Sequence, residues 1–285
     1  MKLGNSSKDG ALAGRLIIIT GASSGIGYGT ARRLAQTEGA RVVAVARRRV
    51  FRIEALASQV AEQVGEERVF PLTTDMADRT QAEAVVRQIE DKFGRVDGFI
   101  HAVNRALKLP ALDVSDREFD LTMQVNVKSA LYGVQAVAPA MRRQGVGGIV
   151  IYNPTPSETA EFVASEAVYT AAAHALSALT AGWVRQLAGS GVGIREVTPS
   201  PDGGAGDSGA WGRAGASHDA LLVAALHEAL NTRVPEAPAP ARTSLLSFRA
   251  SAEHTEPDRS AANSSGAARD PQVLRSRGGL VLKEF

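Results

Sequence analysis

One stretch of the sequence decides the fold: Thr20-Gly21-Ala22-Ser23-Ser24-Gly25-Ile26-Gly27. The apolar run at residues 16–19 precedes it, and a segment with helical character begins near Thr30. A buried strand, a glycine-rich turn and a helix start form a phosphate site in this order. Glycine admits an anion close to the backbone, and the helix N-terminus attracts negative charge. We therefore expect a phosphate diester here; the alternative is an ordinary turn between strand and helix.

Composition excludes several classes of protein. The chain has 285 residues, 44% of them hydrophobic, which suits one large α/β domain or at most two small ones. The absence of cysteine excludes disulfides, thiolate catalysis and cysteine-bound metals, and we expect no metal site. No apolar stretch reaches the ~20 residues that span a bilayer, and the N-terminus is polar, so we expect a cytoplasmic protein without a membrane partner. The net charge is only +2 and the basic residues are dispersed, so we expect no nucleic acid partner.

Strand-like and helix-like segments alternate along the chain. Expected strands cover residues 15–20, 41–46, 68–72, 96–103, 148–152 and 193–198. Expected helices cover residues 25–38, 48–64, 80–93, 115–144, 165–187 and 219–230. Ser115 and Glu118 form a capping box at the start of the fourth helix. This alternation predicts a doubly wound parallel sheet of the Rossmann type, with helices on both faces in a three-layer α/β/α arrangement.

The composition also predicts domain boundaries. Residues 1–11 form a polar tail, and residues 12–232 carry the Rossmann-type domain. After Pro199 the sequence is rich in small residues and has little periodicity, so we expect an irregular C-terminal region. Residues 233–285 begin with a Pro/Ala linker and continue as a polar segment that we expect to be disordered.

The glycine spacing G-x-x-x-G-x-G, together with Thr20, closely resembles the short-chain dehydrogenase/reductase family, and the resemblance extends over about residues 12–200. It implies a domain that binds NAD or NADP. The residues expected to contact the cofactor are Thr20, Gly21, Ser23, Ser24, Gly25, Ile26, Gly27, Arg47, Arg48, Asp75, Met76 and Pro199.

Three arginines indicate which of the two cofactors is bound. Arg47, Arg48 and Arg49 follow the second expected strand, where a Rossmann sheet meets the adenosine ribose. An acidic residue there would bond the 2′-hydroxyl and repel a 2′-phosphate, whereas arginine binds phosphate. The sequence therefore favours NADP(H) over NAD(H); the alternative is a solvated basic start to the next helix.

Two further positions follow from the resemblance. Asp75 matches an aspartate that accepts a bond from the adenine amino group, and it also suits the N-cap of the helix that follows. At the end of the fourth strand, His101-Ala102-Val103-Asn104 stands in place of the family's Asn-Asn-Ala-Gly, so Asn104 replaces a glycine. On a buried strand we expect His101 to be a hydrogen-bonded core residue.

Tyr169 matches the tyrosine of the family's Tyr-x-x-x-Lys motif, which acts as general acid to a carbonyl oxygen. The lysine position is Ala173, and His174 lies about 140° round the helix from Tyr169. Asn126 matches an asparagine that holds a water in the proton relay, and Thr155 or Ser157 would supply the hydroxyl that binds the carbonyl.

Two functions are consistent with these residues. The first is an NADP(H)-dependent oxidoreductase that acts on the carbonyl or alcohol group of a small-molecule substrate. The alternative is a non-redox protein on the same scaffold: a pseudoenzyme, a cofactor-bound sensor or partner, or a proton-transfer enzyme. The family also implies a homodimer or homotetramer through residues 115–144 and 165–187. Ala130, Val134, Ala171 and Leu179 would suit that packing, unless they are buried within one subunit.

Overall fold

The protein is described by a computed structural model that covers residues 10–154, 160–198 and 211–231. Its strands are β1 (Leu16–Thr20), β2 (Arg41–Ala46), β3 (Val69–Thr73), β4 (Gly98–His101), β5 (Gly147–Tyr152) and β6 (Val192–Val197). Its long helices are α1 (Gly25–Gln36), α2 (Val50–Val64), α3 (Arg79–Phe93), α5 (Ser129–Gln144), α6 (Ala160–Gln186) and α7 (Trp211–Asn231). Shorter helices are η1 (Ala111–Asp113), α4 (Asp116–Met123) and the π-helix η2 (Gln124–Lys128).

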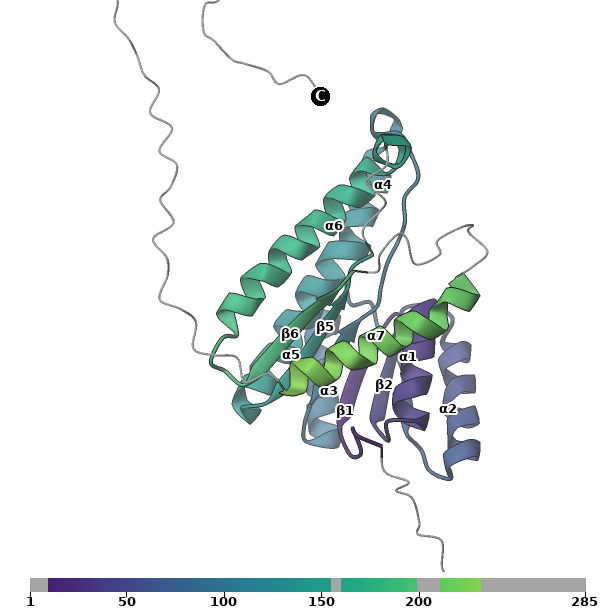
Figure 1. The fold of residues 1–285 in the computed structure, drawn as a ribbon, viewed down its shortest axis with the longest axis vertical. Helices are drawn as coiled ribbons and strands as arrows, with labels where there is room; N and C mark the ends of the chain where they lie inside the picture. The colour runs from purple at the N-terminus through teal and green to yellow at the C-terminus, as the bar shows by residue number, and fades with distance from the viewer. Residues whose placement is uncertain (1–9, 155–159, 199–210, 232–285) are drawn as a thin grey trace, which may run out of the picture. The chain divides into compact units, whose positions relative to one another are not determined.

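The six strands form one parallel sheet in the order β3-β2-β1-β4-β5-β6. Strand order reverses between β1 and β4, and in open α/β sheets ligands bind beside such a switch point, at the carboxyl ends of the strands. The predicted doubly wound Rossmann-type sheet is confirmed. In Figure 1, α7 crosses one face of the sheet beside α1, with α2 next to α1.

Side-chain alternation along the central strands builds two cores, one on each face of the sheet. Ile17 and Ile19 of β1 pack into the core beneath α1, α2 and α7, whereas Leu16 and Ile18 pack into the core beneath α3, α5 and α6. All four side chains are at most 1% exposed. Because both faces of β1 are covered, its sequence is continuously apolar, as parallel strands in the centre of a sheet require.

The helix expected at residues 115–144 is interrupted. It consists of α4, the π-helical turn η2 and α5, and Pro139 lies inside α5. Ser115 of the expected capping box is the N-cap of α4, since its hydroxyl accepts a hydrogen bond from the Glu118 N–H at 3.3 Å, whereas the Glu118 carboxylate pairs with Arg105. A single apolar period describes α4 and α5 equally well, so periodicity alone did not reveal the π-turn between them.

Several other boundaries differ from the predicted ones. The fourth strand is shorter than residues 96–103, and the helices expected at 165–187 and 219–230 begin earlier. Within α6, Glu166 has non-helical angles (φ −128°, ψ 19°) and marks a kink. The expected tail at residues 233–285 lies outside the described residues. Among the helices that are described, none is long and apolar enough to cross a membrane.

Candidate active site

A pocket of about 380 Å³ lies at the carboxyl ends of β1, β2, β3 and β4. Eight residues predicted to contact the cofactor line it: Thr20, Gly21, Ser23, Ser24, Arg47, Arg48, Asp75 and Met76. The other predicted residues near the glycine turn are Gly25, Ile26 and Gly27, which form the first turn of α1. Pro199 lies outside the described residues. The predicted contact residues did not include Arg49, Asn104, Val125 or Ser129, which also line the pocket.

The glycine turn has the shape of an anion cradle. Gly21 has φ +75°, and a β-carbon there would lie 2.6 Å from the Ala102 carbonyl oxygen. Gly25 also has a positive φ, +54°, but a β-carbon there would meet no atom within 4 Å. Ser24 is the N-cap of α1, yet its side chain makes no capping hydrogen bond. The first N–H groups of α1 therefore lack a side-chain cap, which fits the pyrophosphate of a dinucleotide.

Arg47 and Asp75 face each other across the pocket. The Arg47 guanidinium (Nη1) lies 3.1 Å from Asp75 Oδ2, and Asp75 Oδ1 accepts a hydrogen bond from the Ala77 N–H at 3.0 Å. Asp75 is not the N-cap of α3, because Asp78 holds that position and accepts from the Gln81 N–H. The helix-cap alternative for Asp75 is therefore wrong: it caps the turn that leads to the helix. Among the residues described along the pocket, three arginines outnumber one carboxylate.

Tyr169 is buried in α6, with 6% of its surface exposed. Its hydroxyl donates to the Pro154 carbonyl oxygen at 2.7 Å and accepts from the Asn104 side-chain amide at 2.9 Å. Burial raises the pKa of Tyr169 above the usual 10, and the negative charge of the Glu166 carboxylate raises it further. The hydrogen bond from Asn104 acts in the opposite direction and lowers this pKa.

Asn126 lies in the π-turn η2 and is 5% exposed. Its Oδ1 accepts from the Arg105 N–H at 2.7 Å, and its Nδ2 donates to the Arg105 carbonyl oxygen at 2.9 Å. The Arg105 guanidinium bonds Thr122 Oγ1 at 2.8 Å and the Glu118 carboxylate. The side chain of Asn126 thus holds the loop after β4, which carries Asn104.

The position at which the family's motif has a lysine is buried in this chain. Ala173 is 4% exposed, and its carbonyl oxygen accepts from Asn153 Nδ2 at 2.9 Å. The same amide lies 2.7 Å from Glu196 Oε1 on β6, which ties α6 to the end of the sheet. His174 is exposed, as its position on the far side of the helix from Tyr169 predicts, and its ring bonds the Thr170 carbonyl oxygen. Thr155 and Ser157 lie outside the described residues.

His101 is a satisfied core residue, as expected. Its ring nitrogens lie 3.0 Å from Thr20 Oγ1 and 3.4 Å from Ser129 Oγ, and the side chain is fully buried. Burial lowers the pKa of His101 to about 3, so the ring is neutral at physiological pH. No group of three or more metal-ligating side chains occurs in the part of the chain that the structure describes.

Comparison with known proteins identifies the family. The model of the short chain dehydrogenases matches residues 15–202. The chain belongs to the short-chain dehydrogenase family. A relative called an uncharacterized oxidoreductase, from Staphylococcus aureus strain MW2, is 30% identical over 188 residues, which cover 66% of this chain and 78% of the relative. Members of this family are oxidoreductases that bind NAD(P) and act on small-molecule substrates.

Solved structures agree with this family. A short-chain dehydrogenase/reductase from Serratia marcescens BCRC 10948 is 30% identical, with a TM-score of 0.61 over 67% of this chain and 76% of that one. A metagenomic short-chain oxidoreductase in complex with NADP has a TM-score of 0.68 over 79% of this chain and 96% of that one. At 24% identity, the second likeness supports the fold alone.

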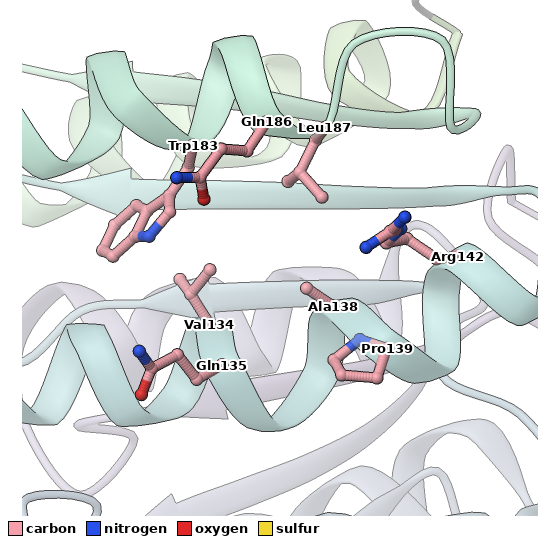
Figure 2. Close-up of a pocket in the computed structure, with 8 residues that line it drawn as sticks. All are labelled: Val134, Gln135, Ala138, Pro139, Arg142, Trp183, Gln186 and Leu187. Carbon is pink, nitrogen blue, oxygen red and sulfur yellow. The ribbon is translucent and has the colours of Figure 1, made fainter.

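Within the short-chain dehydrogenase fold, α5 and α6 are the helices expected to pair two copies. Ala130 and Val134 are buried in the core of their own subunit, which is the alternative given for them above. Leu179 is half-buried against the same core, whereas Ala171 is exposed. A groove of about 190 Å³ lies between the two helices. In Figure 2, Trp183 of α6 is directed toward Val134 of α5.

Proposed function

We propose that this protein is an NADP(H)-dependent oxidoreductase that reduces a carbonyl or oxidises an alcohol, with Tyr169 as general acid and base. The observation that carries the proposal is the place of Asn104. It lines the pocket that contains the glycine turn, and its amide donates to the Tyr169 hydroxyl. Nucleotide pocket and phenol are therefore separated by one side chain.

Each part of the pocket has a proposed task. The N–H groups at the start of α1 would hold the pyrophosphate, and Asp75 would meet the adenine. Arg47, with Arg48 in support, would bind a 2′-phosphate through the planar fork of its guanidinium. When bound, the nicotinamide supplies or accepts a hydride. This preference for NADP(H) is supported by three arginines around one carboxylate.

Tyr169 would transfer the proton to and from the substrate oxygen. In reduction its hydroxyl turns from the Pro154 carbonyl toward the substrate and protonates the substrate oxygen; in oxidation it accepts the proton back. Thr155 or Ser157 would orient the substrate oxygen. Asn126 would keep the loop after β4 in place through its two hydrogen bonds to Arg105.

The test uses the purified chain. NADPH binding is followed by fluorescence, and NADPH oxidation is followed with a panel of aldehydes and ketones. Tyr169→Phe should lower the turnover rate ~10²–10⁴-fold, because it removes the acid, while the Kd for NADPH stays unchanged. Tyr132→Phe, on α5, is the matched control. Equal turnover by wild type and Tyr169→Phe would refute the role of Tyr169, and NADPH binding without any turnover would favour the non-redox alternative.

We also propose that two copies of the chain pair through α5 and α6. The support is the small, exposed outer side of α6, where Ala171, Ala178 and Ala181 allow close helix approach. Sedimentation equilibrium measures the mass of the species in solution, and a monomer at micromolar concentration would contradict the pairing.

A further inference from the structure

The Tyr169 oxygen has two hydrogen-bond partners of opposite kinds. Its single proton goes to the Pro154 carbonyl oxygen, and one of its lone pairs receives an N–H of Asn104. When Tyr169 acts as an acid, its O–H bond breaks, the proton moves to the substrate oxygen, and the bonding electron pair stays on the phenolic oxygen. A carbonyl oxygen cannot bond that anion, whereas an N–H donor can.

We propose that Asn104 is a catalytic residue: its amide N–H stabilises the Tyr169 phenolate during proton transfer, a role that rests on the function proposed above. A hydrogen bond to a charged oxygen is about twice as strong as one to a neutral oxygen. The Asn104 bond is therefore stronger in the state that follows proton release than in the resting enzyme. Only an interaction with this difference accelerates the step.

The surroundings make this donor important. Tyr169 is almost fully buried, and a buried anion lacks the water that would otherwise solvate it. The Glu166 carboxylate acts against the phenolate, since it raises the pKa of Tyr169, and Asn104 is the side chain that lowers that pKa. Four residues along α6, the methyl group of Ala173 offers no donor. The loop after β4 supplies one instead.

The loop holds Asn104 ready for this task. The next residue, Arg105, is fixed through its N–H and its carbonyl by Asn126, and its guanidinium is fixed by Thr122. The donor thus needs little rearrangement when charge develops on the phenol, which is the condition under which a hydrogen bond contributes most to catalysis. The glycine that the family pattern has at position 104 would carry no such group.

The experiment replaces the donor without adding charge or changing shape much. Asn104→Leu removes the amide, Asn104→Gln keeps it on a longer side chain, and Asn231→Ala is a control at an exposed asparagine of α7. Residue 104 is itself exposed, so both substitutions should fold. Asn104→Leu should lower kcat for alcohol oxidation and carbonyl reduction about 10–100-fold, Asn104→Gln should restore part of it, and the Kd for NADPH should change less than about threefold.

A second readout needs neither substrate nor cofactor. In protein labelled with ¹³C at the tyrosine ζ carbon, Tyr169→Phe assigns the Tyr169 signal by its disappearance. Asn104→Leu should shift this signal and leave that of Tyr152 in place. An unchanged Tyr169 signal, or an unchanged kcat while Tyr169→Phe is inactive, would overturn the role of Asn104 and leave the proposed function intact. Wild-type protein that binds NADPH but turns over no substrate would overturn both.

Discussion

The nucleotide half and the catalytic half of this site lie at the same edge of one sheet, yet they differ in how they are built. The proposed nucleotide half is built mainly on backbone, with a glycine turn, strand ends and the N-terminus of α1, and the side chains of Arg47, Arg48 and Asp75 complete it. The catalytic half is made of side chains from elements distant in sequence, such as Asn104, Asn126 and Tyr169. The fold sets the geometry of a backbone site, whereas a single substitution can remove one side chain from a catalytic site or add another.

That difference explains where the chain departs from its family. The glycine turn keeps the spacing that the resemblance implies, whereas the resemblance implies a lysine where the chain has Ala173 and a glycine where it has Asn104. The change at position 104 occurs on a loop that Asn126 already holds, so it costs the fold little. The four predictions below test whether the two halves are separable.

The largest effect is expected from the glycine turn. Gly21→Ala should destabilise the protein by about 3 kcal/mol, because it combines a left-handed φ with a β-carbon 2.6 Å from a carbonyl oxygen. Gly25→Ala should fold at a cost of about 1 kcal/mol but bind NADPH weakly, since it adds a methyl group at the first residue of α1, where we propose that the pyrophosphate binds. Gly14→Ala is the matched control, with φ +73° and open space around its β-carbon. Urea unfolding and NADPH fluorescence measure the two effects; equal NADPH affinity of the Gly25 and Gly14 variants would contradict the cradle.

The next effect concerns the stability of the folded protein in acid. It depends on His101, whose ring contacts Thr20 and Ser129 behind the pocket. The unfolded chain binds a proton on this residue below pH 6.5, whereas the folded protein does so only near pH 3. As the pH falls from 6.5, the free energy of unfolding should therefore decrease by about 1.4 kcal/mol per pH unit through this group. Urea unfolding at pH 6.5 and 4.5 gives the loss of unfolding free energy for wild type and for His101→Gln, and the difference between the two losses is the contribution of His101. Equal losses in the two proteins would show that His101 is already charged in the folded state.

Arg47 tests cofactor choice within the nucleotide half. Arg47→Glu should weaken NADPH binding about 10–100-fold, because a charge-assisted bond to the 2′-phosphate is replaced by repulsion. NADH affinity should change less than about threefold, since NADH has no 2′-phosphate. Arg117→Glu, at an exposed position of α4, controls for net charge. The preference for NADP(H) fails if both cofactors lose affinity equally.

The smallest effect concerns the missing amine. Ala173→Lys should raise kcat by about tenfold, because an ammonium on the face of Tyr169 stabilises its phenolate. Asn104 already supplies part of this stabilisation, which limits the gain. Thermal unfolding accompanies the rate measurement, since Ala173 is buried and a longer side chain crowds its surroundings. A folded Ala173→Lys protein with unchanged kcat would show that the catalytic half differs from the family by more than this residue.

The pattern of the sequence was sufficient to predict the sheet, its alternating helices and the pocket around the glycine turn. Each of these depends on local order along the chain, such as continuous apolar runs in β1 and β2 and glycines at fixed spacing. Predictions that needed a side chain's direction left two alternatives open. Ala130 and Val134 look like interface residues on a helical wheel, but their burial depends on which side of α5 meets the sheet.

By itself the sequence determined the Rossmann-type fold, the family and the position of Tyr169 in the family's motif. Apolar periodicity and glycine spacing are patterns of neighbouring residues, so they can be read from the sequence without the structure. Only the tertiary structure decided that Asn104 donates to the Tyr169 oxygen, that Asn126 binds the backbone of Arg105, and that Asn153 donates to the Ala173 carbonyl oxygen. These contacts join residues 20 to 65 positions apart. They exist because the parallel strands bring their carboxyl ends, and the loops that follow them, to one edge of the sheet.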